Sequence, residues 1–356
     1  MSTPERIVAF FSPREPALSY LFAEIAKRRA FTSIWPSDTM DMLRWAAGRL
    51  RFRSVCALPF WPWRNAPAIC GPLLQRAART HDTVIFTKPD QALLLRWFAN
   101  HRKIYYAFDD YQTYQRDWAK DERDLLAAAH HVIAVSPALG KALQARCPSA
   151  SGRIFISQNA VPDGWLAEGP PDASPMELPH PIAGVFGRIS SRLRLDWLAD
   201  SVERTPSLHW LFVGDVEKGE MAPVDYAHLA RLKRLPNCIF AGPKPYEKLA
   251  RYARAVDVAV LPYSDRSVNP CASPMRFFMQ LPYGQPIVAT PGCALLKEYE
   301  PFVTMCGSSD ALTETLRRLQ DQDFDDGMAD ARRKAALDHT WRVRADRLLD
   351  HLDSVH

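Results

Sequence analysis

Five segments between residues 237 and 290 decide the fold class of this chain. They read Asn237-Cys-Ile-Phe-Ala-Gly242, Tyr246-Glu-Lys-Leu-Ala-Arg251, Val256-Asp-Val-Ala-Val-Leu-Pro262, Ser273-Pro-Met-Arg276 and Gly284-Gln-Pro-Ile-Val-Ala-Thr290. Short apolar runs that end at Gly or Pro and alternate with helical patterns are typical of a parallel sheet with crossover helices. Because the carboxyl ends of parallel strands meet at one edge, a ligand is expected there, beside Gly242, Pro262, Tyr263, Ser273 and Arg276.

This region resembles the C-terminal half of GT-B glycosyltransferases, especially the large retaining family of bacterial enzymes that build polysaccharides and lipopolysaccharides. The match is colinear, with Asp257 and Pro262, then Pro274 and Arg276, then residues 284–290 in the family's order. The resemblance implies an α/β fold of two Rossmann-like, doubly wound domains that face each other across a cleft. It also implies a C-terminal helix that crosses back to the N-terminal domain.

Length and composition are consistent with that expectation. A chain of 356 residues with 47% hydrophobic residues fits two domains of about 150 to 180 residues. The seven cysteines are odd in number and form no C-x-x-C pair, which argues against a disulfide framework or a zinc site and favours a reducing cytosol. A net charge of +5 suits anionic small ligands or an anionic membrane surface but is too small for a nucleic-acid binder.

The N-terminal apolar run is confined to residues 7–11, which is too short for a signal peptide. No later segment approaches the roughly 20 apolar residues of a membrane span. We therefore expect a cytoplasmic protein, either soluble or peripheral on the inner face of the plasma membrane.

Strands and helices alternate along the first half, which favours a doubly wound domain. The predicted strands are 6–11, 54–58, 83–87, 103–107, 131–135 and 153–156, with helical patterns at 17–28 and 137–145. Six prolines and two glycines between residues 162 and 181 mark a linker. The predicted divisions are an N-terminal acceptor-side domain over 1–162, a linker over 163–181, a donor-binding domain over 182–338 and a C-terminal helix over 339–356.

Arg276 is the leading candidate for donor binding. We expect it in the first turn of a helix with Ser273 as N-cap and Pro274 as the first residue, where free N–H groups and a guanidinium attract phosphate. Gly187 and Arg188 close the first strand of the second domain, and a Gly turn there lets the backbone approach a diphosphate. The alternative for Arg276 is a solvated arginine on a helix surface, and the alternative for Gly187 and Arg188 is an ordinary turn between a strand and a helix. The predicted donor-binding set is completed by Lys244, Tyr246, Tyr263, Ser273 and Glu298.

One departure from the resembling family concerns its paired glutamates, eight positions apart, of which the second binds the donor ribose. These positions fall on Cys271 and Met279, and neither side chain is a carboxylate. Three explanations are open. Glu298 or Gln280 takes the place of the glutamate that binds the ribose, or the donor has a ribose that needs fewer hydrogen bonds, such as a deoxyribose, or the protein is not an active transferase. Met279 itself is most simply a core residue.

Asp109 and Asp110 are the candidate catalytic residues, because they follow a predicted strand at its carboxyl end. They resemble the end of a "Y-D-x-x-D-D/E" segment of the family, although Ala107 stands in place of its first Asp. Successive side chains on a strand point to opposite faces, so one of the two is expected to act on the acceptor or sugar. The alternative is a capping or turn role.

A basic and aromatic segment spans residues 44–64. Arg44, Arg49, Arg51 and Arg53 follow helical spacing beside an apolar face, as in a helix that lies on an anionic bilayer. The alternative is a core helix with a solvated basic face. We assign Arg14, Arg49 and Arg53 to the acceptor or membrane side.

The predicted function is transfer of a sugar from a nucleotide diphosphate-sugar to a glycan or lipid-linked acceptor in cell-surface polysaccharide synthesis. The nucleotide-sugar is a co-substrate, and neither a cofactor nor a metal ion is expected. Two rivals stay open: a sugar-nucleotide epimerase of the same fold, and a catalytically silent GT-B scaffold or binding subunit.

Overall fold

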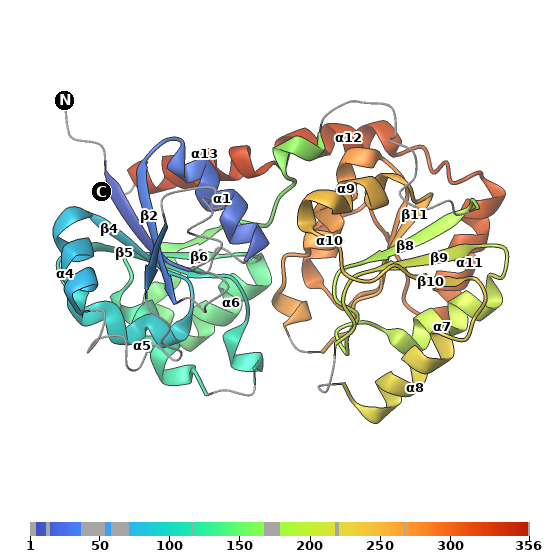
Figure 1. The fold of residues 1–356 in the computed structure, drawn as a ribbon, viewed down its shortest axis with the longest axis horizontal. Coiled ribbons are helices and arrows are strands. Elements are labelled where there is room, and N and C mark those ends of the chain that lie inside the picture. The colour runs from blue at the N-terminus through green and yellow to red at the C-terminus, as the bar shows by residue number, and fades with distance from the viewer. Residues whose placement is uncertain are drawn as a thin grey trace. The chain divides into compact units, whose positions relative to one another are not determined.

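The computed structural model describes residues 5–11, 15–36, 54–57, 71–114, 117–166, 179–217, 221–266 and 268–354. The chain forms two compact units, Met1–Gln158 with Trp341–His356, and Asn159–Thr340 (Figure 1). The C-terminal helix α13 (Trp341–Ser354) belongs to the first unit, as the fold class implies. Arg28, which follows helix α1 (Pro16–Ala26), donates to Asp346 at 2.6 Å, and this bond ties α13 to α1.

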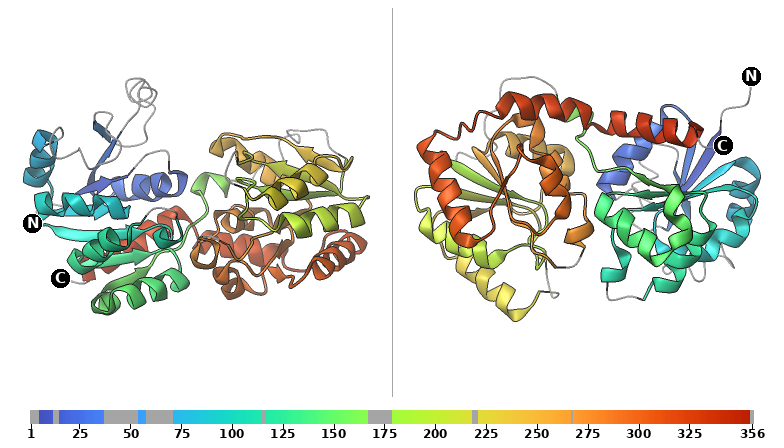
Figure 2. Two further views of the ribbon diagram at one scale, coloured as in Figure 1. Left: turned by 90° about the horizontal axis from the view of Figure 1, so that it is seen from below. Right: turned by 180° about the vertical axis from the view of Figure 1, so that it is seen from behind.

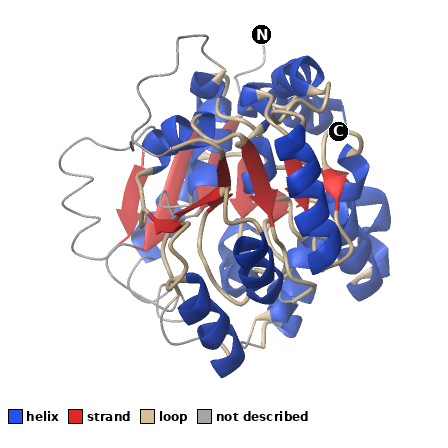
Figure 3. Ribbon diagram, turned by 90° about the vertical axis from the view of Figure 1, so that its right-hand side faces the viewer, coloured by secondary structure: helices blue, strands red, loops and turns tan. Residues whose placement is uncertain are grey.

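The first unit contains a seven-stranded parallel sheet in the order β3-β2-β1-β4-β5-β6-β7. Helices flank the strands of the chain (Figure 3). The strands are β1 (Arg6–Phe10), β2 (Ala30–Pro36), β3 (Ser54–Ala57), β4 (Thr83–Phe86), β5 (Arg102–Ala107), β6 (His131–Ala134) and β7 (Ile154–Ile156). In the part of this unit that the structure describes, the helices besides α1 and α13 are α4 (Gly71–Thr80), α5 (Ala119–Ala128) and α6 (Pro137–Arg146), and a long 3₁₀ helix is η2 (Pro89–Phe98).

The second unit contains a six-stranded parallel sheet in the order β10-β9-β8-β11-β12-β13. Its strands are β8 (Ile182–Phe186), β9 (His209–Val213), β10 (Cys238–Phe240), β11 (Val258–Leu261), β12 (Ile287–Ala289) and β13 (Thr304–Met305). Its helices are α7 (Leu195–Arg204), α8 (Pro223–Leu232), α9 (Tyr246–Arg254), α10 (Met275–Phe278), α11 (Ser309–Asp321) and α12 (Ala329–Asp338), with a 3₁₀ helix η8 (Ala294–Tyr299).

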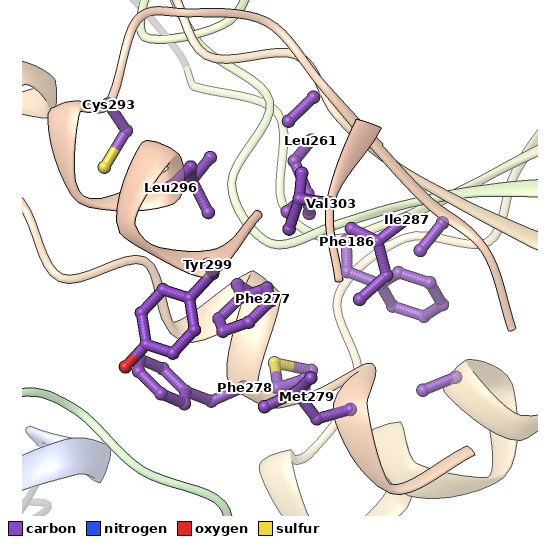
Figure 4. Packing of buried hydrophobic residues seen from close by; sticks show 14 of the residues in the cluster. Phe186, Leu261, Phe277, Phe278, Met279, Ile287, Cys293, Leu296, Tyr299 and Val303 are labelled. Atoms are coloured by element: carbon purple, nitrogen blue, oxygen red, sulfur yellow. The ribbon is translucent and has the colours of Figure 1, made fainter. Parts of the chain in front are cut away.

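Side chains from the strands of the second unit alternate between two hydrophobic layers, because successive residues of a strand face opposite sides of the sheet. On β11, Val258 and Val260 pack with α7, α8 and α11, whereas Ala259 and Leu261 pack with α9, α10 and η8. Both faces of the sheet are therefore covered (Figure 2). In the second layer, the rings of Phe277, Phe278 and Tyr299 gather near Met279 (Figure 4).

The sequence prediction missed one central strand. β2 pairs with both β1 and β3, yet its sequence Ala30-Phe-Thr-Ser-Ile-Trp-Pro36 interrupts the apolar residues with Thr and Ser and ends in Pro. Ser33 is nevertheless fully buried. The division between units falls at Gln158 and Asn159, ahead of the expected linker over 163–181, and residues 167–178 of that segment lie outside the described ranges.

The strand order of the second sheet places a switch point between β8 and β11, where the chain stops adding strands on one side and starts on the other. Ligands of open α/β sheets bind at this point, outside the carboxyl ends of the strands. Within the described ranges, no helix is long and apolar enough to cross a bilayer, and no group of three or more His, Cys, Asp or Glu is arranged to hold a metal ion.

Candidate functional site

Two loops meet at the switch point of the second unit. The loop after β8 and the loop after β11 are joined by backbone hydrogen bonds from Arg194 N to the Pro262 carbonyl at 2.7 Å and from Ser264 N to the Arg192 carbonyl at 2.9 Å. Asn269 reinforces the junction, because its amide nitrogen donates to the carbonyls of both Arg192 and Ser264. The loops therefore form one fixed platform at the carboxyl edge of the sheet.

The Arg276 guanidinium lies against Gly187 on this platform. Gly187 has φ +84°, a left-handed conformation that favours glycine, and an added Cβ there would lie 2.8 Å from Arg276 Nε. Arg276 Nη2 donates to the Arg188 carbonyl at 2.7 Å, and its Cζ lies 5.2 Å from the centre of the Tyr263 ring. Three residues that the sequence singled out, Gly187, Tyr263 and Arg276, are thus brought together.

Two guanidiniums at the platform, those of Arg192 and Arg276, form no ion pair with a carboxylate of the described residues. In the described parts of the chain, Arg192 donates to the amide oxygen of Asn269 at 3.0 Å and Arg276 to a carbonyl, and neither forms an ion pair. Burial lowers the pKa of Arg276; nearby Tyr263 opposes that shift and the charge of Arg192 adds to it. Two close guanidiniums that lack a counter-ion are stabilised by an anionic ligand.

Gly214, at the end of β9, is a site residue that sequence reasoning missed. A Cβ added there would lie 2.0 Å from the Gly187 carbonyl oxygen, so only glycine allows the two turns to pack so closely. The signal was present in the sequence, because Gly214 directly follows the apolar run that forms β9.

Ser273 does not cap a helix. The helix that carries Arg276, α10, has only four residues and begins after Pro274, with no side-chain cap. The Ser273 hydroxyl instead accepts a hydrogen bond from Asn159 N at 2.8 Å, and its carbonyl accepts one from Asn159 Nδ2 at 2.6 Å. The prediction that Ser273 is an N-cap is therefore wrong. A helix of four residues has no N-terminal anion site of its own, so the Arg276 side chain is what attracts an anion here.

The remaining candidates for donor binding have separate surroundings. Arg188 is exposed, with Nη1 3.8 Å from Glu217, and Lys244 Nζ lies 5.7 Å from the centre of the Tyr252 ring. The ring of Tyr246 stacks on Trp165 at 5.4 Å, and Glu298 is exposed on η8. Among these residues, Arg188 lies directly beside the platform, because its carbonyl accepts from Arg276.

Asp109 and Asp110 lie at the carboxyl end of β5 in the first unit, and their surroundings differ. Asp110 is buried and accepts from Arg146 at 2.6 Å, and Arg146 also pairs with the fully buried Glu122 at 3.1 Å. Burial raises the pKa of Glu122, although Arg146 opposes that shift. Asp109 is half-buried and accepts from the Tyr114 hydroxyl at 2.7 Å. Asp110 thus has a structural role as the partner of Arg146.

Three candidates for the acceptor or membrane side, Arg14, Arg49 and Arg53, lie outside the described residues, as does the basic and aromatic segment over 44–53 and 58–64.

Comparisons with known proteins agree with the fold. No protein-family model matches the chain. A stretch of 192 residues is 23% identical to a Bacillus subtilis (strain 168) protein named as a teichuronic acid biosynthesis glycosyltransferase, TuaH, and covers 53% of this chain and 45% of that one. The chain therefore matches less than half the length of that curated relative.

Solved structures match over nearly the whole chain. Anabaena HepE in complex with UDP and glucose superposes with a TM-score of 0.77 at 17% identity, covering 98% of this chain and 100% of that one. A glycosyltransferase from Rickettsia africae gives a TM-score of 0.78 at 13% identity, covering 99% of each chain. The chain has the GT-B fold of glycosyltransferases. The fold class expected from the sequence is confirmed.

Within this GT-B fold, Met279, the second of the two positions where the resembling family has a glutamate, is a core residue. Met279 is 4% exposed and packs in the core beside Phe277 and Phe278 (Figure 4). Gln280 is fully buried, with its amide oxygen accepting from Gln285 at 2.6 Å. Of the two substitutes considered from the sequence, only Glu298 is exposed to solvent.

Proposed function

We propose that the protein is a glycosyltransferase that moves a sugar from a nucleotide diphosphate-sugar to a carbohydrate-containing acceptor. The observation that carries this proposal is the pair of guanidiniums, Arg192 and Arg276, which lie at the switch point of a GT-B sheet without carboxylate partners among the described residues. A diphosphate supplies the negative charge that this platform lacks.

In the proposed reaction, the second unit binds the donor and stabilises the leaving diphosphate. Arg276 is held between the Arg188 carbonyl and the Tyr263 ring, so its guanidinium is oriented before the ligand arrives. Preorganised charge of this kind stabilises developing negative charge without reorganisation in the transition state. Guanidiniums supply that charge here, and the proposal requires neither an organic cofactor nor a metal ion.

We place the acceptor in cell-surface polysaccharide synthesis, as a glycan or a lipid-linked glycan reached from the cytoplasmic face of the membrane. Two points support this placement. The relative TuaH is named for teichuronic acid biosynthesis, and the chain carries a net charge of +5, which favours an anionic membrane surface.

A donor-consumption assay tests the proposal. The purified protein is incubated with UDP-, GDP-, ADP- and dTDP-sugars, with and without bacterial lipid-linked oligosaccharide extract, and the products are identified by mass spectrometry. A transferase releases a nucleoside diphosphate in proportion to glycosylated product, and Arg276→Ala slows both together. Conversion of a donor to its epimer without acceptor identifies an epimerase. Donor binding without any turnover identifies a silent scaffold, and either result overturns the proposal.

A further inference from the structure

Asn269 lies inside the platform and contacts both of its loops. It begins the 3₁₀ helix η6 (Asn269–Cys271), and it is fully buried. Its amide nitrogen donates to the carbonyls of Arg192 at 2.7 Å and Ser264 at 2.8 Å, and its amide oxygen accepts from Arg192 Nε at 3.0 Å. The nitrogen thus faces two acceptors and the oxygen faces a donor, so the amide fits this place in one orientation.

Arg192 is held by these bonds at its main chain and at its side chain. Its carbonyl also accepts from Ser264 N at 2.9 Å, and its own N–H donates to the Ser190 hydroxyl at 3.3 Å. A guanidinium is planar, so the Nε bond to Asn269 restricts the direction in which the group points. Among the described residues, the terminal nitrogens Nη1 and Nη2 of Arg192 have no hydrogen-bond partner.

Arg194, two positions further along the same loop, has a different partner. Its Nε and Nη2 donate to the carboxylate of Asp196 at 3.0 Å and 2.8 Å, and its Cζ lies 4.0 Å from the centre of the Trp197 ring. Within the described ranges, Arg194 is therefore paired with a carboxylate, whereas Arg192 is held by an uncharged amide. An anion meets less competition at Arg192 than at Arg194.

We propose that Asn269 is a positioning residue, which orients Arg192 to bind the diphosphate of the donor through both terminal nitrogens. The amide oxygen engages Nε, so Nη1 and Nη2 keep the fork geometry that matches two phosphate oxygens. An amide holds the guanidinium without neutralising its charge. It also orders a long side chain before the ligand arrives, which reduces the entropy lost on binding. This inference rests on the proposed transferase function and adds the residue that prepares its donor site.

A double-mutant cycle tests this role, by isothermal titration calorimetry of the full chain with UDP, GDP, ADP and dTDP. Arg192→Ala should weaken binding of the tightest of these nucleotides by at least about tenfold, from the loss of charged hydrogen bonds. Asn269→Ala should weaken it by about fivefold, because the Arg192 side chain is no longer ordered in advance. In the Arg192→Ala background, Asn269→Ala should change the affinity by less than about twofold, because Asn269 acts through Arg192.

Arg192→Lys tests the orientation without a change at the buried Asn269, so its result does not depend on whether Asn269→Ala folds. Lysine keeps the positive charge but has neither the Nε that Asn269 holds nor a planar fork. We expect Arg192→Lys to bind nucleotide almost as weakly as Arg192→Ala. Full recovery of the wild-type affinity by lysine would overturn the inference, because charge alone would then be sufficient.

Two variants are matched controls. Asn237→Ala removes another buried asparagine, whose amide nitrogen donates to main-chain carbonyls at 3.1 to 3.2 Å at the amino end of β10, the edge of the sheet opposite the platform. It should lower the melting temperature and keep the nucleotide affinity. Arg194→Ala removes the arginine that is paired with Asp196 and should also keep the affinity.

Three further results would count against these roles. Equal nucleotide affinities of Arg192→Ala and Arg194→Ala would overturn the inference. An effect of Asn269→Ala that persists in the Arg192→Ala background, or that Asn237→Ala reproduces, would also overturn it, because the role of Asn269 would then be structural. Wild-type protein that binds none of the four nucleotides would overturn the proposed function, and this inference with it, so the two failures are distinguishable.

Discussion

At the scale of single residues, Arg276 carries the donor proposal. Its guanidinium donates to the Arg188 carbonyl and lies over the Tyr263 ring, without an ion pair in the described parts of the chain. We predict that Arg276→Ala weakens nucleoside diphosphate binding by about 1.5 to 3 kcal/mol, the loss of a charged hydrogen bond, and leaves the melting temperature nearly unchanged.

Isothermal titration calorimetry with UDP, GDP and dTDP measures this loss. Arg333→Ala is the control, because Arg333 is an exposed arginine on α12 that pairs with Asp330. Equal affinities of the wild type and Arg276→Ala for every nucleotide would remove Arg276 from the site.

Met279 leads to a second prediction at this scale. A buried thioether in the core cannot accept hydrogen bonds from ribose hydroxyls, so these hydroxyls should contribute little to affinity. UDP and 2′-deoxy-UDP should therefore bind within about tenfold of each other, a difference of at most about 1.4 kcal/mol. Competition against a fluorescent nucleotide measures the ratio. A preference of about a hundredfold for UDP would mean that another residue reads the ribose, and Glu298→Gln would then be the first variant to make.

At the scale of elements, the turn after β8 fixes where Arg276 lies. Gly187→Ala forces a non-glycine residue to φ +84° and places Cβ 2.8 Å from Arg276 Nε, whereas Gly327→Ala meets a similar φ of +71° with no atom within 4 Å. Both variants should lose about 1 kcal/mol of folding stability from backbone strain. Only Gly187→Ala should also lose nucleotide affinity, because it displaces the guanidinium. Denaturant unfolding and calorimetry separate the two effects, and equal nucleotide affinities of both variants would refute this account of the turn.

The elements also show which features could be predicted from the sequence and which could not. The glycines and prolines that end β8, β10 and β11 are local signals, so the sheet and the meeting of Gly187, Tyr263 and Arg276 could be predicted. Contacts between residues that lie far apart in the sequence could not be predicted. Asp110 pairs with Arg146 and Ser273 with Asn159, and no local pattern links residues so far apart. β2 was missed because its buried Ser33 reads as polar in the sequence.

At the scale of the whole molecule, the net charge of +5 and the basic residues between 44 and 53 are the sequence features behind the proposed role at an anionic membrane. If this segment binds lipid, each basic residue near the bilayer contributes about 1 kcal/mol, and salt screens the attraction. Replacing Arg44, Arg49, Arg51 and Arg53 together by Gln should release the protein from phosphatidylserine vesicles without a change in nucleotide affinity. Liposome flotation measures this release. If the wild-type protein does not bind anionic vesicles at low salt, a soluble acceptor becomes the better proposal.

The central claim is that this GT-B fold binds a nucleotide diphosphate-sugar at the cationic platform of its second unit. Thermal unfolding of the wild type with UDP, GDP, ADP, dTDP and their sugars tests it most directly. A ligand at a hundred times its dissociation constant stabilises the native state by about 2.7 kcal/mol, so at least one nucleotide should raise the melting temperature in a concentration-dependent way, and less in Arg276→Ala. A melting temperature unmoved by every nucleoside diphosphate and every sugar nucleotide at millimolar concentration would contradict the claim.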